Sequence, residues 1–349
     1  MSALFDSKDW SEMLAEILDI IAKKHNLYHE DYMSFAGVCK SWRSAAVRAA
    51  NKDHYPNGLP SRFPSLLSVR KKYRPDDYLE LFCLSNNSIR KIRLPKAISG
   101  KLCMSSSGWL LTVGDDFVPK LIHPFSRKII NLPKFYTFSR SEFWYREGLG
   151  IRKLVLVDSS LVVMLLGAYE KLGFCRLGDE KWTTIIDSKI ENHPTTIVTV
   201  STLPDEFYDE WSGGNKNRAY ILGFEANGLL VVIRKVLYSN IFDRIYKTRS
   251  FKVFKYDFDS EEWSEVKDLG TKALFVGHGP SFWMEEDTRG VIKGNCIYFN
   301  HDFCDYNGGS VNGAERDMGV YHMSSQTVEP HFNRRTRSHF PPPIWLPHV

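Results

Sequence analysis

The sequence has no long uninterrupted hydrophobic run and no paired cysteine spacing. Its longest apolar stretch, Leu161 to Ala168, is far shorter than the roughly 20 residues of a membrane-spanning helix. Asp6, Lys8, Asp9 and Glu12 interrupt the N-terminal region, where a secretory signal needs an apolar stretch. The six cysteines are scattered along a chain long enough to fold without disulfides. We therefore expect reduced thiols, a location in the cytoplasm and/or nucleus, and no membrane partner.

The chain also lacks a strong excess of charge of either sign. It has 46 basic and 41 acidic residues, a net charge of +5. Residues 1–50 carry 6 basic and 7 acidic side chains, so the small positive surplus belongs to the remainder. Because this surplus is spread over some 300 residues, it is a weak nucleic-acid signal, and we expect no nucleic-acid partner.

Local motifs for catalysis and cofactor binding are missing as well. Gly277-His278-Gly279 is too short for a phosphate-binding loop and has no following Lys-Ser or Lys-Thr. Cys296, His301 and Cys304 match no common zinc-ligand spacing. The sequence therefore predicts no catalytic residues, no metal ligands and no cofactor, although a propeller enzyme with loop-borne groups would leave no local motif.

A helical period is present in the first 50 residues. Trp10, Leu14, Ile17, Leu18 and Ile21 form one apolar stripe with a 3.6-residue period. A second stripe follows, with a break expected at Gly37; it comprises Tyr32, Phe35, Cys39, Trp42, Ala46 and Ala49. Fifty helical residues enclose little core, so these stripes either pack on each other and on the rest of the chain or dock helices of a partner.

From about Phe63 the pattern changes to short apolar or alternating runs separated by turns. Aromatic residues make up 13% of the chain, which favours pleated surfaces. The expected strands include Trp109 to Val113, Leu161 to Leu166 and Cys296 to Phe299. Many short strands with little helix predict a sandwich, a barrel or a propeller.

One unit recurs loosely within this region: an apolar strand, a polar turn, and a tryptophan that opens the next strand. Val253 to Trp263 and Phe174 to Trp182 have this form, and Leu121 to Ile129 and Val320 to Val328 are weaker copies. Such hairpins are typical of the outer strands of propeller blades. At roughly 45 residues per blade, the region holds about six blades, with seven possible and a large sandwich as the alternative.

The N-terminal pattern resembles the F-box. The resemblance rests on Trp10 to Leu18 (WSEMLAEIL) and, more specifically, on Val38 to Ala45 (VCKSWRSA). The first half departs from the motif, because Met13 stands at its leading leucine and Leu14 at its proline. Proline suits the first turn of a helix, so Leu14 keeps the apolar surface and loses that preorganisation.

The remainder resembles the plant F-box proteins with a KIB-type, kelch-like C-terminal β-propeller, formerly a domain of unknown function. The motifs that carry this resemblance are GWLL (108–111), HPF (123–125), LP (132–133), FCRLGDEKW (174–182), VFKYD (253–257), NCIYF (295–299) and PPPIW (341–345). The resemblance implies an α+β multidomain chain: a three-helix F-box at residues 8–50, a linker at 51–62 and an all-β propeller at 63–349.

The resemblance further implies a non-catalytic substrate-recognition subunit of an SCF-type (Skp–cullin–F-box) E3 ubiquitin ligase. The F-box would bind the Skp adaptor and through it cullin, and the propeller would bind an unknown protein substrate. Matched residue by residue, the adaptor-binding or unit-forming positions are Met13, Leu14, Ile17, Leu18, Val38, Cys39 and Trp42. The alternative is a propeller that binds proteins but is no longer coupled to the ligase. The target-binding candidates are the stretches Asp205 to Asn217, Arg234 to Ser250 and Asp302 to Asp317.

Overall fold

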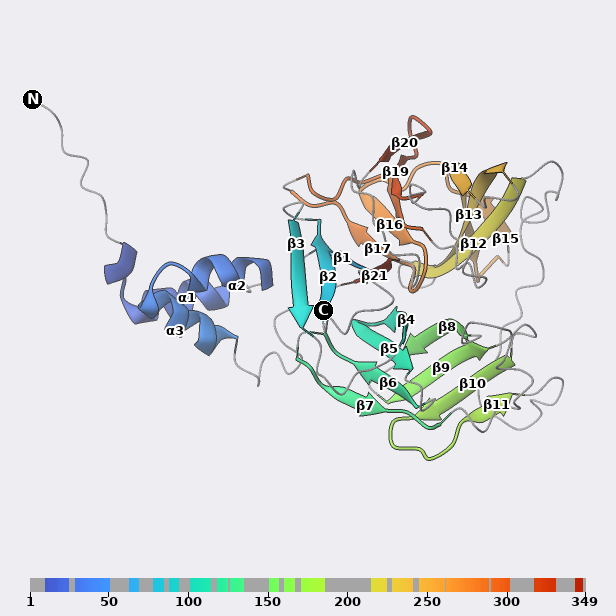
Figure 1. Cartoon of the computed structure of the whole chain (residues 1–349). Helices are drawn as coiled ribbons and strands as arrows, with labels where there is room; N and C mark the ends of the chain where they lie inside the picture. Colours follow the sequence, from blue (N-terminus) through green and yellow to red (C-terminus); the bar gives the residue numbers. More distant parts are fainter. Residues whose placement is uncertain are drawn as a thin grey trace, which may run out of the picture.

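In the computed structural model of the chain, the described residues form three short helices followed by five β-sheets (Figure 1). The structure describes residues 10–24, 29–50, 63–68, 78–84, 88–93, 101–113, 118–124, 126–134, 151–156, 160–166, 171–185, 215–224, 228–240, 245–260, 262–288, 290–301, 317–330 and 343–347. Within these residues, no helix is both long enough and apolar enough to cross a membrane.

The helices lie where the two apolar stripes predict them. A 3-10 turn (Trp10–Glu12) leads into α1 (Ala15–Lys24), which is followed by α2 (His29–Ala36) and α3 (Lys40–Ala49). Their shared core is small and consists of Leu18, Ala22, Phe35, Ala36, Ala45 and Ala46. Residues 51–62 lie outside the described residues, so the proposed linker and the domain boundaries on either side of it stay a prediction.

The sheets are arranged as the blades of a propeller (Figure 1). Blade 1 contains β1 (Ser65–Ser68), β2 (Tyr78–Cys83), β3 (Ser88–Arg93) and β21 (Ile344–Leu346); blade 2 contains β4 (Lys101–Ser106), β5 (Trp109–Val113), β6 (Pro119–Ile122) and β7 (Ile129–Asn131). Blade 3 contains β8 (Ile151–Leu156), β9 (Leu161–Leu166), β10 (Lys171–Arg176) and β11 (Thr183–Ile185); blade 4 contains β12 (Asn215–Phe224), β13 (Gly228–Asn240), β14 (Ile245–Asp257) and β15 (Glu262–Glu265). Blade 5 has five strands, namely β16 (Lys272–Val276), β17 (Phe282–Glu285), β18 (Cys296–Phe299), β19 (Gly319–His322) and β20 (Thr327–Pro330).

The expected number of about six blades is therefore wrong, as is the sandwich alternative. Five sheets use the length that was assigned to six, because two of them are larger than the average blade. Strands β13 and β14 have 13 residues each, and blade 5 carries the extra hairpin of β16 and β17. The recurring hairpins were located correctly, since they form the last two strands of blades 2 to 5.

The C-terminal strand closes the ring. β21 pairs antiparallel with β1, so the two ends of the propeller share blade 1. Trp345 is fully buried; its indole N–H donates to the carbonyl of Val276 in blade 5 (3.1 Å), and its own carbonyl accepts from Ser105 of blade 2 (2.9 Å). A buried tryptophan thus anchors the C-terminal strand to both neighbouring blades.

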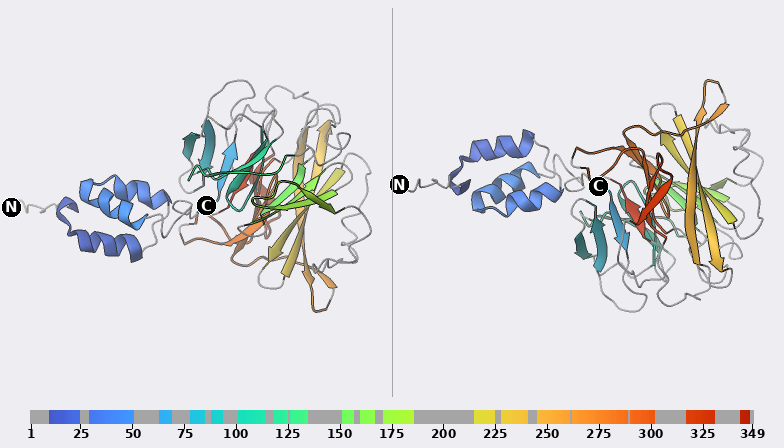
Figure 2. Two further views of the ribbon diagram at one scale, coloured as in Figure 1. Left: turned by 90° about the horizontal axis from the view of Figure 1, so that it is seen from below. Right: turned by 90° about the horizontal axis from the view of Figure 1, so that it is seen from above.

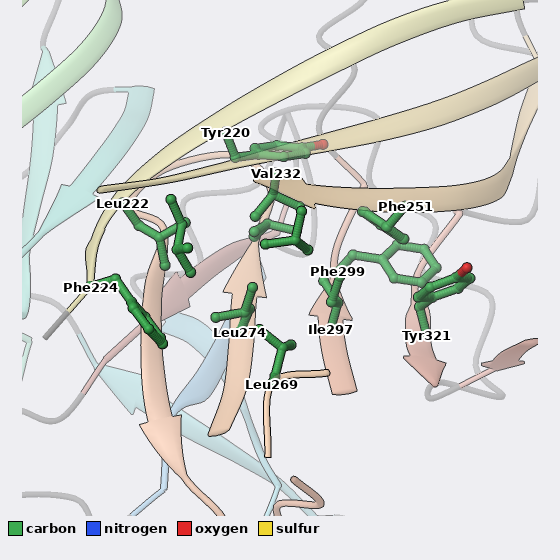
Figure 3. Packing of buried hydrophobic residues seen from close by; sticks show 13 residues of the cluster. Tyr220, Leu222, Phe224, Val232, Phe251, Leu269, Leu274, Ile297, Phe299 and Tyr321 are labelled. Carbon is green, nitrogen blue, oxygen red and sulfur yellow. The ribbon is translucent and has the colours of Figure 1, made fainter. Parts of the chain in front are cut away.

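Apolar side chains fill the spaces between neighbouring blades. Figure 3 shows the contact of blades 4 and 5, where Tyr220, Leu222 and Phe251 lie against Leu274, Ile297, Phe299 and Tyr321. Phe251 contacts Phe299 and Tyr321 at ring-centroid distances of 5.3 and 5.2 Å. Similar clusters join blades 2 and 3, blades 5 and 1, and blades 1 and 2. These aromatic contacts account for the high aromatic content.

Candidate functional site

The helices expose large apolar side chains to solvent to an unusual degree. Among the described residues, twelve large hydrophobic side chains are exposed, and six of them belong to this small unit: Trp10, Leu14, Ile17, Ile20, Val38 and Val47. Leu14 is the most exposed of all twelve, at 65%. Soluble proteins rarely expose apolar groups in such a concentration unless a partner covers them. The three helices therefore form the candidate binding surface.

Helix α1 is apolar on two faces rather than one. Leu18 and Ala22 point into the shared core, whereas Leu14, Ile17 and Ile20 recur every three residues on the outer side. The carbonyl of Leu14 accepts the first helical hydrogen bonds, from the amides of Ile17 and Leu18 (both 3.1 Å), which fixes Leu14 at the very start of the helix. One face of α1 holds the unit together, and the other is available to a partner.

Trp42 lies at the centre of the unit. Its ring is tilted against Phe35 at a centroid distance of 4.6 Å, and its indole N–H donates to the carbonyl of Trp10 (2.8 Å). This hydrogen bond ties the turn before α1 to the start of α3. Trp42 is half-buried, so it both packs within the unit and reaches its surface.

The seven positions predicted from the motif fall into three groups. Leu14, Ile17 and Val38 are exposed, and Met13, Cys39 and Trp42 are half-buried. Leu18 has no exposed surface and contributes by packing inside the unit. Cys39 is the N-cap residue of α3, in extended backbone conformation and without a side-chain capping bond.

Three exposed residues were not among the predicted positions: Trp10, Ile20 and Val47. Trp10 belongs to the apolar stripe and begins the stretch that resembles the F-box, but the residue-by-residue match did not give it as an adaptor-binding position. Ile20 and Val47 interrupt the polar side of their helices, at 60% and 56% exposure. An apolar residue on an otherwise polar helix face is the signal that finds them.

In the propeller, the most elaborate polar arrangement is buried. Arg234 of β13 is completely inaccessible, and its guanidinium donates to Thr248 Oγ1 (2.7 Å), the carbonyl of Asn300 (3.0 Å) and Asp317 Oδ2 (2.9 Å). It also stacks over the Phe299 ring, 4.6 Å from the centroid. Because Asn300 and Asp317 belong to blade 5, this network locks blades 4 and 5 together.

One of the target-binding candidates is a strand hairpin rather than a connecting loop. The stretch from Arg234 to Ser250 is mostly strand, the long hairpin of β13 and β14, and its first residue is a buried structural group. Most of the other two candidate stretches lies outside the described residues; Asp317, at the end of one, is buried and pairs with Arg234.

A second buried group organises the turn after β16. Asn300 donates from its side-chain amide to the carbonyl of Pro343 (3.0 Å) and accepts from the amide of His278 (3.0 Å). Gly277 has a positive φ of 147°, and a Cβ there would collide with the Asn300 side chain. Gly277-His278-Gly279 is thus a structural turn beside the closing strand.

No group of three or more metal-ligating side chains occurs in the part of the chain that the structure describes. Cys296 lies 3.3 Å (Sγ to Nδ1) from His322, whose Nε2 lies 2.9 Å from Glu329. Burial raises the pKa of the Cys296 thiol, which disfavours the thiolate that a nucleophile needs.

Comparison with known proteins adds the family. The model of the KIB1-4 β-propeller matches residues 81–322. The chain belongs to the KIB1-4 β-propeller family. F-box protein SKIP23 of Arabidopsis thaliana is 25% identical over 97% of this chain and 95% of its own length. F-box protein At2g17036 of the same plant is 25% identical over 97% and 95%, and F-box/kelch-repeat protein KIB1 is 25% identical over 65% and 62%. The resemblance to plant F-box proteins with a KIB-type propeller is confirmed.

Proposed function

We propose that this KIB1-4 family chain is the substrate-recognition subunit of an SCF-type E3 ubiquitin ligase. The three helices bind a Skp adaptor, which connects the chain to cullin, and the propeller binds the protein to be ubiquitinated. The observation that carries the proposal is the outer apolar face of α1, with Leu14, Ile17 and Ile20 exposed at the end of the molecule that resembles the F-box. The F-box names of the relatives support the choice of adaptor as the occupant.

The physics of the unit agrees with this role. Its internal core contains four alanines and only two large side chains, Leu18 and Phe35. A core of that size buries little apolar area, so the unit gains much of its stability when adaptor helices cover its outer face. Half-buried Trp42 is the expected hot spot, because large aromatic side chains at desolvated centres dominate such interfaces.

Co-purification of the full chain with a Skp adaptor tests the proposal. Leu14→Lys and Ile17→Lys place a charge on the outer face without touching the internal core, so both should lose the adaptor. Trp42→Ala should lose it as well, but this substitution also removes the contact with Phe35 and the bond to Trp10. The two lysine variants therefore separate a lost surface from a lost fold.

Ile89→Lys is the matched control, because Ile89 is an exposed apolar residue of blade 1. It should recover the adaptor as well as the wild type does. Equal recovery by all variants would show that the outer face of α1 is not the adaptor surface. A complete absence of adaptor with the wild type would favour the alternative, a propeller that binds proteins without coupling to the ligase.

A further inference from the structure

The hairpin of β13 and β14 is the largest departure from a regular blade. At about 3.3 Å per residue, each 13-residue strand spans about 43 Å, whereas the 4–6-residue strands of blade 1 span at most about 20 Å. Both views in Figure 2 show these long strands crossing the full depth of the propeller. We call the part beyond Arg234, namely Lys235–Asn240 and Ile245–Ser250, the arm.

The base of the arm is fixed by the buried network. Thr248 Oγ1 donates to Asp317 Oδ2 (2.7 Å) and accepts from Arg234 Nε (2.7 Å), so both strands of the arm are held where they leave the blade. Val236, opposite Thr248 in the ladder, is also buried. Because a buried ion pair holds its base, the arm leaves the blade in a fixed direction.

Among the arm residues whose side chains the structure describes, the outward side carries basic residues and the apolar Leu237. Leu237 faces outward directly opposite Lys247 and is 42% exposed. Lys235 lies two residues before Leu237 on the same side of its strand, and Arg249, exposed, lies two residues after Lys247. The register skips Arg249, so it is the extra residue of a β-bulge. β-Bulges turn side chains toward functional edges of a sheet. Basic residues on edge strands have a second role, because they prevent these strands from pairing with other chains.

The charge of this hairpin stands out against the rest of the chain. The twelve residues of the arm contain three basic residues (Lys235, Lys247 and Arg249) and no acidic residue, so they supply a net charge of +3 in a chain whose total is +5. Such a concentration of positive charge on a projecting element attracts acidic partners and speeds their association.

We propose that the outward side of the arm docks an acidic segment of the target protein, with an apolar residue of that segment packed on Leu237. This inference rests on the proposed function, since it places target recognition on blade 4 of the propeller. Lys235, Lys247 and Arg249 supply the complementary charge, and Leu237 supplies the apolar contact that a purely electrostatic surface lacks.

The test uses the purified full chain with its adaptor and a defined probe, a fluorescein-labelled octapeptide of six glutamates and two leucines. Fluorescence anisotropy should show binding that weakens as salt rises from 50 to 200 mM. Lys247→Glu/Arg249→Glu should raise the Kd by about tenfold or more, because two attractive charges become repulsive. Leu237→Ser should raise it by a smaller factor.

Arg90→Glu/Lys91→Glu is the matched control, because both residues lie on β3, the outer strand of blade 1, and the charge change is identical. This variant should bind the acidic peptide within about twofold of the wild type. An equal loss in both double variants, or no binding by the wild type at millimolar peptide, would overturn the proposal. A single-stranded oligonucleotide that binds as tightly as the acidic peptide would also overturn it in favour of a nucleic-acid surface.

The two proposals fail separately. Arm variants should recover the adaptor like the wild type, because the arm and the helices share no residue. If the adaptor is lost from the wild type while the peptide still binds the arm, the ligase role fails and the docking surface stands. If the adaptor binds and the peptide does not, only the docking surface fails.

Discussion

The helices and the propeller use the same kinds of side chain in opposite ways. In the propeller, large apolar groups are buried between blades, and even a cation, Arg234, is buried and paired with Asp317. In the helices, the core is built mostly from alanines, and leucine, isoleucine and tryptophan stand in solvent. The described part of the propeller buries its large apolar side chains within itself, whereas the helices leave theirs exposed.

Two tryptophans make the same contrast at the level of single residues. The indole N–H groups of Trp42 and Trp345 each donate to a distant backbone carbonyl, at 2.8 and 3.1 Å. Trp345 is enclosed at the junction of blades 1 and 5, while Trp42 keeps part of its surface exposed. The hydrogen bond fixes the ring in both cases, and only Trp42 keeps surface that a partner could cover.

The first prediction compares the two ion pairs. Arg234→Met leaves the buried carboxylate of Asp317 without its cation and should lower the free energy of unfolding of the propeller by about 3–5 kcal/mol. Arg48→Met breaks the exposed pair between Arg48 and Asp19 (2.8 Å) and should cost the helices about 0–1 kcal/mol. Urea unfolding followed by tryptophan fluorescence and by far-UV circular dichroism measures both.

The double variant Arg234→Met/Asp317→Leu is the control for the buried pair. Removing both charges should recover much of the lost stability, because no unpaired charge remains inside. Equal losses of unfolding free energy in Arg234→Met and Arg48→Met would contradict the comparison, because the propeller would then depend on its buried ion pair no more than the helices depend on their exposed one.

The second prediction concerns the response of the propeller to acid. His123 is buried, its ring is T-shaped to that of Trp109 with the two centroids 5.3 Å apart, and its Nδ1 accepts from the amide of Ser126 (3.2 Å). Burial, and secondarily Lys128, lowers the pKa of His123 to about 4. The unfolded chain, with an ordinary histidine pKa of about 6.5, takes up the proton first, so stability falls as pH drops from about 6.5 to about 4.

The loss attributable to His123 is up to about 3 kcal/mol, from about 1.4 kcal/mol per pH unit. His123→Asn retains an acceptor for the Ser126 amide and removes the titration, so its unfolding free energy should change less over this range. Thermal melts at half-unit pH steps compare the two proteins. Parallel pH profiles would show that His123 is protonated without cost in the folded propeller.

The sequence predicted the elements better than their number. The strand expected at Trp109 to Val113 and the hairpin from Val253 to Trp263 are where periodicity placed them, because both signals are local. The blade count failed because it assumed an average blade length, whereas β13 and β14 have 13 residues each and blade 5 carries an extra hairpin. Arg234 follows an apolar run, and nothing near it reveals its partners, since Asn300 and Asp317 lie 66 and 83 residues away.

The site was predicted in part for the same reason. Motif matching identified Leu14, Ile17 and Val38, which the structure exposes, together with Leu18, which it buries. A stripe with a helical period shows that residues share a side, but α1 has two apolar sides, and the choice between them depends on where α3 packs. Only the three-dimensional structure separates Leu18 from Ile17 and adds Ile20 to the outer face.

The third prediction compares how fast two cysteines, one in the helices and one in the propeller, are chemically modified. The expected effect is small and is measured at single residues. Cys39 is half-buried at the start of α3, whereas Cys175 is enclosed between blades 2 and 3, where burial and the charge of Asp179 raise its pKa to about 12. Because the thiolate is the reactive form, maleimide should modify Cys39 first and Cys175 only on unfolding. Mass spectrometry of digested protein at successive times measures each site.

Adaptor binding should then slow the modification of Cys39 and leave that of Cys175 unchanged, because only the helical surface becomes covered. Cys39→Ser identifies the peptide that carries the fast label. Labelling of Cys175 as fast as Cys39 would mean that blades 2 and 3 open readily, and the propeller would not be the closed structure that its core implies. Labelling of Cys39 at an unchanged rate in the adaptor complex would place the adaptor away from the start of α3, leaving the outer face of α1 as the remaining contact.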